Sequence, residues 1–148
     1  MSKTFQGRSI LPANLKGSAV VTRQGFNTLA SFYKSILSQA SEAVCNDQDN
    51  PELFGKLLSG RIICLPGGIG STSTGATWDS VVHLGISPKA MLFSESIDSL
   101  SAAGLILGEV WAGHRICTVD RLGDQFLEYV RDDCQIEILE NGTVIVDQ

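Results

Sequence analysis

RIICLPGGIGSTSTGAT, residues 61–77, places an apolar run, a glycine-rich loop and the start of a helical pattern in succession. The run RIICL (61–65) predicts a buried strand, because it is short, apolar and rich in β-branched residues. Residues 76–84, ATWDSVVHL, have the spacing of a helix that ends at Gly85. The twelve residues 66–77 hold four glycines, five hydroxyl side chains and no charge. A strand, a glycine loop and a helix in this order predict the first part of a parallel βαβ unit.

The pattern continues on the C-terminal side. KAMLF (89–93) and RICTV (115–119) predict two further strands, and the apolar residues 99–111 between them predict a helix packed closely on a sheet. Alternating strands and helices indicate a parallel sheet. On the N-terminal side, residues 27–43 repeat apolar side chains at spacings of three and four, which predicts an amphipathic helix. Residues 53–58 are expected to form a short helical turn.

Both ends of the chain predict antiparallel pairing. Residues 5–24 contain two short β segments around a Pro-Ala-Asn turn, and Asn141-Gly142 joins two alternating segments of the tail into a hairpin. We expect one α/β domain over residues 1–148, with mixed parallel and antiparallel β pairing.

The composition limits the class of protein. The chain is 43% hydrophobic and 18% charged, which is typical of a folded globular domain. Its net charge of −5 argues against nucleic acid as the main partner. No apolar run is long enough to predict a membrane span, and MSKTFQGRSI has no apolar signal core, so a cytoplasmic location is expected.

The four cysteines stand at positions 45, 64, 117 and 134. None forms a CxxC pair, and only two histidines accompany them, so the spacing predicts no metal site in this chain. We expect structural thiols.

The glycine loop should lie at the carboxyl edge of the parallel sheet, where ligands of open α/β folds bind. Its amides and the following helix would favour an anion there. Two phosphate motifs fail in the loop. A P-loop would need lysine where Ala76 stands, and a dinucleotide fingerprint would need glycine where Ser73 stands. Two interpretations stay open: a hydroxyl that only caps the next helix, or a loop whose glycines let the backbone approach a ligand.

The segments GRSILP (7–12), LPGGIGSTSTG (65–75) and KAMLFSESIDSLSAAGLILGEVW (89–111) resemble the small subunit of aconitase X. The resemblance covers residues 7–121. It implies a swivelling β/β/α domain that pairs with a large subunit. The iron or iron–sulfur centre is then expected in that partner, with no cofactor bound by this chain.

The resemblance also implies the chemistry of the loop. Aconitase-like swivelling domains use the serine of a Gly-Ser-Ser motif as the base of a dehydration. The matching residue is Ser71, with Ser73 as the alternative because this loop is one residue longer. A serine hydroxyl must be activated to act as a base, and amides at a helix N-terminus could stabilise its alkoxide. The expected substrate-binding residues are Gly68, Gly70, Thr72, Ser73, Thr74 and Arg8.

Other polar residues have weaker interpretations. Arg8 is either a ligand for a substrate carboxylate or a solvated surface charge. His83 and His114 show no partner in the sequence, and Glu95 and Asp98 are expected to serve mainly as turn or helix caps. The large aromatic residues are expected in the core or in a partner interface; they are Phe26, Phe32, Tyr33, Trp78 and Trp111.

Two functions of different classes follow. The first is a hydro-lyase subunit, active only with its large subunit, that acts on a small carboxylate. Within this family the uncharged loop, with Ile69 where relatives often carry arginine, favours cis-3-hydroxy-L-proline over 5-phosphomevalonate as substrate. The second is a binding module that holds an anionic metabolite in the glycine loop without catalysis.

Overall fold

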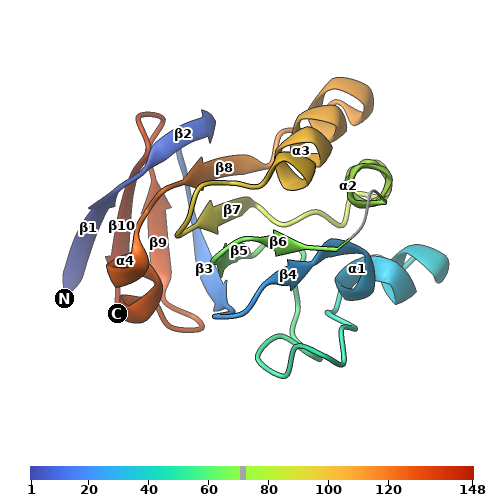
Figure 1. Ribbon diagram of the computed structural model, residues 1–148, viewed down its shortest axis with the longest axis horizontal. Helices are drawn as coiled ribbons and strands as arrows, with labels where there is room; N and C mark the ends of the chain where they lie inside the picture. Colours follow the sequence, from blue (N-terminus) through green and yellow to red (C-terminus); the bar gives the residue numbers. More distant parts are fainter. Residues whose placement is uncertain (71–72) are drawn as a thin grey trace.

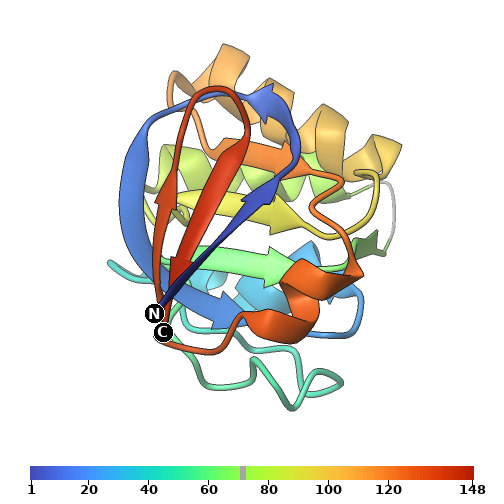
Figure 2. The ribbon, with the colours of Figure 1, turned by 90° about the vertical axis from the view of Figure 1, so that its left-hand side faces the viewer.

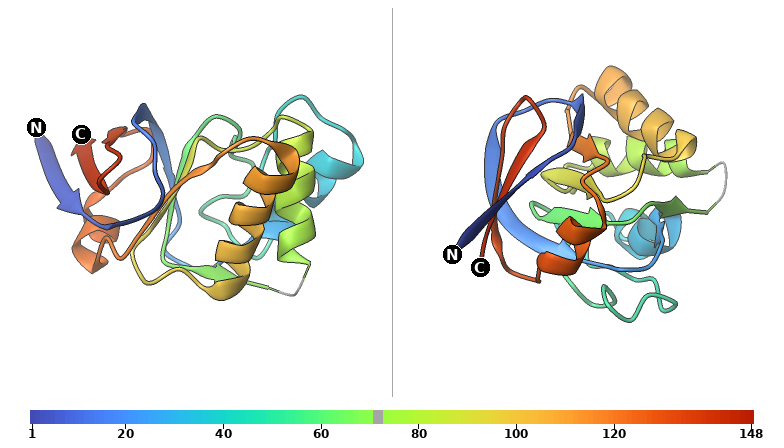
Figure 3. Two further views of the ribbon diagram at one scale, coloured as in Figure 1. Left: turned by 90° about the horizontal axis from the view of Figure 1, so that it is seen from above. Right: turned by 60° about the vertical axis from the view of Figure 1, so that its left-hand side comes forward.

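The computed structural model describes residues 1–70 and 73–148, and its elements form three layers (Figure 1). Antiparallel strands lie on one side, a parallel sheet lies in the middle, and three helices cover the other side. Views from above and from the side show the same layers (Figure 3). This is the mixed α/β architecture of the β/β/α type that the sequence predicts.

The central layer is a parallel sheet in the order β3 (Leu15–Val21), β5 (Ile62–Leu65), β7 (Ala90–Phe93) and β8 (Cys117–Asp120). The three strands expected around residues 61–65, 89–93 and 115–119 are therefore confirmed. All four residues of β5 are buried, and they alternate between two cores. Ile62 and Cys64 face the antiparallel layer, whereas Ile63 and Leu65 face the helices.

The antiparallel layer contains β1 (Ser2–Gln6), β10 (Thr143–Asp147) and β9 (Gln135–Ile138), and β9 pairs with the first half of β3. The hairpin at Asn141-Gly142 is confirmed. The sequence predicted β3 and β2 (Arg8–Leu11) but not β1. Although β1 and β2 are consecutive, they stand at opposite ends of the strand order, so the sheet curls until its edges meet at Gly7 (Figure 2). There the Gly7 amide donates to the Gly142 carbonyl over 2.9 Å.

The helical layer contains α1 (Thr28–Leu37), α2 (Thr74–His83) and α3 (Ser99–Ala112). Phe26, Phe32 and Trp78 are buried beneath it, with the Phe32 and Trp78 ring centroids 5.5 Å apart. A fourth helix, α4 (Asp124–Tyr129), packs Phe126 and Leu127 into the core between the two sheets. The sequence did not predict α4.

One predicted helix is confirmed but shorter than expected, and one predicted helical turn does not form. The helix expected over residues 27–43 ends at Leu37, because the Ser38 amide and hydroxyl both bond to the Lys34 carbonyl and Gln39 takes a left-handed φ of 50°. Residues 53–55 lie in a turn, with Gly55 at a φ of 81°, and Leu57 forms an isolated antiparallel bridge with Val44 instead of part of a helical turn.

Candidate functional site

The glycine loop leaves β5 at the carboxyl edge of the parallel sheet. Its first part is held by a two-stranded pair, in which β6 (Gly68–Ile69) runs parallel to β4 (Phe26–Asn27). The Phe26 amide also donates to the Gly67 carbonyl over 2.9 Å. The sequence showed no sign of this pair, because each strand has only two residues. The pair places Ile69 beside the start of α1.

Asp98 connects the loop to the start of α3. One carboxylate oxygen accepts from the Ser101 amide over 2.9 Å, which caps α3, and the other accepts from the Gly68 amide over 2.9 Å. The expected capping role of Asp98 is therefore confirmed. Its bond to Gly68 could not be predicted, because nothing in the sequence indicates which distant amide meets the second oxygen. The Gly68 amide, one of the loop donors expected to face an anion, is already bonded.

The glycines of the loop have different roles. A Cβ on Gly68 would lie 2.4 Å from the Ser101 hydroxyl oxygen and 2.8 Å from an Asp98 oxygen. Gly70 has a φ of 128°, which residues with side chains rarely adopt. Gly75 belongs to α2 and lies where a Cβ on Gly104 of α3 would come within 3.2 Å of its Cα. The close approach expected of these glycines is thus a contact within the fold at Gly68, whereas at the Gly75 contact the residue that must stay small is Gly104.

A hollow of about 180 Å³ opens between the loop and the start of α3. Three of the predicted substrate-binding residues line it: Gly68, Gly70 and Thr74. The remaining lining is Ile69 and residues 98–101. Ser71 and Thr72 lie outside the described residues.

The helix after the loop begins at Thr74, two residues earlier than predicted. Ser73 occupies the N-cap position with helical backbone angles, and its carbonyl accepts from the Thr77 hydroxyl over 2.9 Å. Asn27 and Asp98, which cap α1 and α3 with their side chains, have the extended angles usual for a capping residue. The start of α2 therefore differs from the two side-chain-capped helices beside it.

Arg8 lies near the same edge of the sheet and makes a two-pronged ion pair with Asp120, at 2.9 and 2.7 Å. The Asp120 side chain is fully buried, and the Arg8 side chain is 44% exposed. Burial alone would raise the pKa of Asp120, but hydrogen bonds from Arg8 and from the Ile97 amide outweigh it and hold the pKa below its usual value. Because Ile97 precedes Asp98, this pair supports the segment that bonds to Gly68.

Neither histidine lies at the loop, because α2 and α3 begin there, whereas His83 is the last residue of α2 and His114 follows the end of α3. His83 ends α2, with its Nδ1 3.4 Å from a carboxylate oxygen of Asp79, a partner that the sequence did not reveal. His114 is exposed just beyond α3. Among residues 1–70 and 73–148, no three His, Cys, Asp or Glu side chains form a group that could hold a metal ion.

The four cysteines are free thiols, and all are buried. Burial raises the pKa of Cys64 and raises that of Cys117 to about 11. Such thiols are poor metal ligands and poor nucleophiles, because the thiolate is the reactive form. None of the described helices is long and apolar enough to cross a membrane.

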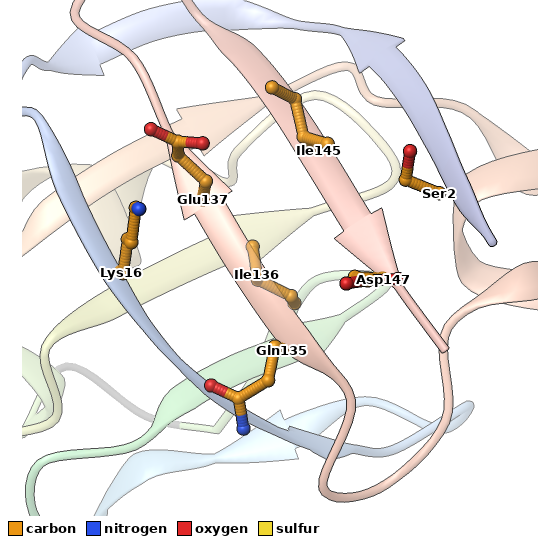
Figure 4. A pocket seen from close by; sticks show the side chains of 7 residues that line it. All are labelled: Ser2, Lys16, Gln135, Ile136, Glu137, Ile145 and Asp147. Carbon is orange, nitrogen blue, oxygen red and sulfur yellow. The ribbon is translucent and has the colours of Figure 1, made fainter.

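A second hollow, of about 320 Å³, lies on the outer face of the antiparallel strands (Figure 4). It is lined by Ser2, Lys16, Gln135, Ile136, Glu137, Ile145 and Asp147. Lys16 and Glu137 are register partners on β3 and β9, as in an ordinary solvated sheet face. It shares no residue with the glycine-loop hollow.

The sequence matches the family model described as the aconitase X swivel domain over residues 4–146. The chain belongs to the aconitase X swivel-domain family. The match extends beyond residues 7–121, which carry the resemblance, and includes the hairpin of β9 and β10. No curated protein sequence matches the chain.

Solved structures show the same fold for this swivel domain. A chain of the crystal structure of Thermococcus kodakaraensis aconitase X in its holo-form superimposes with a TM-score of 0.81 at 19% identity, covering 99% of each chain. The solution structure of a UPF0107 protein superimposes with a TM-score of 0.77 at 23% identity, covering 99% of this chain and all of the other.

Proposed function

We propose that this swivel domain is the small subunit of an aconitase X type hydro-lyase and supplies the base of a dehydration from its glycine loop. Membership of the family supports this proposal. The observation that carries it is the hollow beside the loop, where Gly68, Gly70 and Thr74 meet the start of α3. The base is Ser71, with Ser73 as the alternative.

The proton step can be written for this chain alone. A serine alkoxide takes the proton from the carbon next to the substrate carboxylate, and the electron pair of that C–H bond forms the double bond as hydroxide leaves the neighbouring carbon. Backbone amides at the start of α2 would stabilise the alkoxide. The described residues offer no metal site, so we assign the iron or iron–sulfur centre to the large subunit.

For the substrate we propose cis-3-hydroxy-L-proline, dehydrated to a pyrroline carboxylate. The described lining of the hollow contains the Asp98 carboxylate and no basic side chain. A phosphate group would be repelled by Asp98, whereas the secondary ammonium of hydroxyproline would be attracted to it. The substrate carboxylate would then be bound by loop amides or by the large subunit.

The test is reconstitution of the small chain with its large subunit and assay of both compounds. We expect Ser71→Ala to lower turnover by about 100-fold or more, as removal of a catalytic base does, while substrate still binds. Ser73→Ala is the matched variant, and the larger loss identifies the base. Turnover of 5-phosphomevalonate with hydroxyproline inert would reverse the choice of substrate.

The same variants separate catalysis from simple binding. If both alanine variants lose affinity and turnover in parallel, the loop is a binding site and the metabolite-binding module becomes the better description. Dehydration at full rate by the isolated, metal-free small chain would contradict a site shared between subunits.

A further inference from the structure

The outward face of α3 carries almost no polar side chains. After Ser99, its exposed residues are all apolar and form a row that we call the α3 ridge: Leu100, Ala103, Ile106, Val110 and Trp111. Val110 and Trp111 are 68% and 66% exposed. The one charged residue of α3, Glu109, is paired with Arg115 at 2.6 Å. Since the opposite side of α3 is packed on α2, this helix is apolar all round.

A helix that is apolar all round is normally buried. The α3 ridge is a contiguous exposed apolar patch, and the largest such patch on a monomer is often a functional surface. The antiparallel layer differs in the large apolar side chains that it exposes. Apart from Met1, the large exposed apolar side chains all lie between residues 29 and 111, among the described part of the chain.

The ridge is continuous with the candidate site. Leu100, its first residue, lines the hollow together with Ile69, which is itself 57% exposed. From there the ridge follows α3 away from the loop. A protein that covers the ridge therefore also reaches the open side of the hollow.

We infer that the α3 ridge is the surface on which the large subunit docks, an inference that rests on the proposed function. A second copy of this chain fits less well, because its described residues would bring no metal-binding group to the hollow. Trp111, near the end of the ridge, has the character of an interface anchor, since exposed tryptophans are enriched among the residues that carry binding energy.

The test uses the small chain and the co-expressed large subunit, with binding measured by calorimetry. Val110→Asp and Trp111→Asp should each weaken binding by about 30-fold or more, as loss of an interface anchor does. Their exposure predicts that the melting temperature of the isolated small chain is unchanged. Because both residues lie far along α3 from the hollow, turnover should return when the large subunit is saturating.

The matched control is Leu37→Asp on α1, where the exposed face also carries apolar residues and Leu37 is 65% exposed. We expect it to bind normally. Weakened binding by Leu37→Asp with normal binding by the α3 variants would overturn the inference in favour of α1. If the α3 variants lose self-association but still bind the large subunit, the ridge binds a second copy of this chain and the inference is wrong. A tight complex that uses the ridge but dehydrates neither compound would contradict the proposed function and leave the docking surface intact.

Discussion

At the scale of single residues, the neighbours Gly67 and Gly68 differ in the space that the fold leaves for a side chain. A Cβ on Gly68 would collide with Ser101 and Asp98, whereas one on Gly67 would meet nothing within 4 Å. We expect Gly68→Ala to destabilise the fold by about 1–3 kcal/mol, the usual cost of overpacking. Gly67→Ala should change stability by less than about 0.5 kcal/mol. Urea unfolding of both variants measures the difference.

The same pair also tests the site. If the bond from the Gly68 amide to Asp98 positions the loop, Gly68→Ala should lower turnover of the reconstituted enzyme and Gly67→Ala should not. Equal stability of the two variants would show that Ser101 and Asp98 move aside easily, contrary to the contacts described above.

A second residue-scale prediction concerns Asp120 and acid. Its pKa is lowered in the folded protein, so its contribution to stability is complete above the unfolded pKa of about 3.9 and is lost as the pH falls through the folded value. Asp120→Asn should cost at least about 2 kcal/mol at pH 7, because the charge opposite Arg8 is lost and the amide nitrogen cannot accept the hydrogen bonds of the oxygen that it replaces. The difference from wild type should shrink as the pH is lowered from 7 to 2, because protonation removes the charge of Asp120. Denaturant titrations at both pH values check this, and a constant difference would contradict the ion-pair explanation.

At the scale of elements, the contact between α2 and α3 depends on small residues. A Cβ on Gly104 would lie 2.6 Å from the Trp78 ring, whereas one on Gly75 would first meet a Leu107 carbon at 3.9 Å. Gly104→Ala should therefore destabilise the protein by about 1–3 kcal/mol. Gly75→Ala should stabilise it by about 0.5–1 kcal/mol through helix propensity. Thermal unfolding of each variant shows whether its stability falls or rises. If both variants are destabilised, that result contradicts the distances described for this contact.

Strands made only of apolar residues, and turns marked by residues such as Asn-Gly, could be predicted from the sequence, whereas the two-residue strand pair could not. β5 and β7 stand out because both faces of each strand are buried, so the whole strand is apolar. β4 and β6 have two residues each and exist only because the chain brings them side by side. The spacing in α1 gave a helix but not its orientation: Ser31 and Ser35 face inward while Leu29, Tyr33 and Leu37 are exposed.

Part of the candidate site could likewise be predicted from the sequence, and part could not. The position of the loop at the carboxyl edge and the capping by Asp98 follow from local order along the chain. The bonds from Asp98 to Gly68 and from Arg8 to Asp120 join residues 30 and 112 positions apart, so no local pattern contains them. Arg8, predicted to bind substrate, has a partner within the fold, and its role toward substrate stays a prediction.

At the scale of the whole molecule, the four buried cysteines report on global unfolding. With a pKa of about 11, Cys117 is thiolate in about one molecule per thousand at pH 8. We expect Ellman's reagent to modify the native protein slowly and to count four thiols promptly in guanidinium. Rapid modification of any cysteine in the native state would contradict the burial described for all four.

The strand pairing of the curled sheet determines when, during translation, each strand can meet its partner. β1 and β2 leave the ribosome first, yet their partners β10 and β8 are among the last strands made. The first half of β3 likewise waits for β9, while its second half can pair earlier with β5. A nascent chain therefore carries unpaired strand edges until translation is nearly finished, and such edges favour aggregation. Truncation after residue 130 removes β9 and β10 and should leave β1 and the first half of β3 open to protease, although all four strands of the parallel sheet and the three helices that cover it are already present.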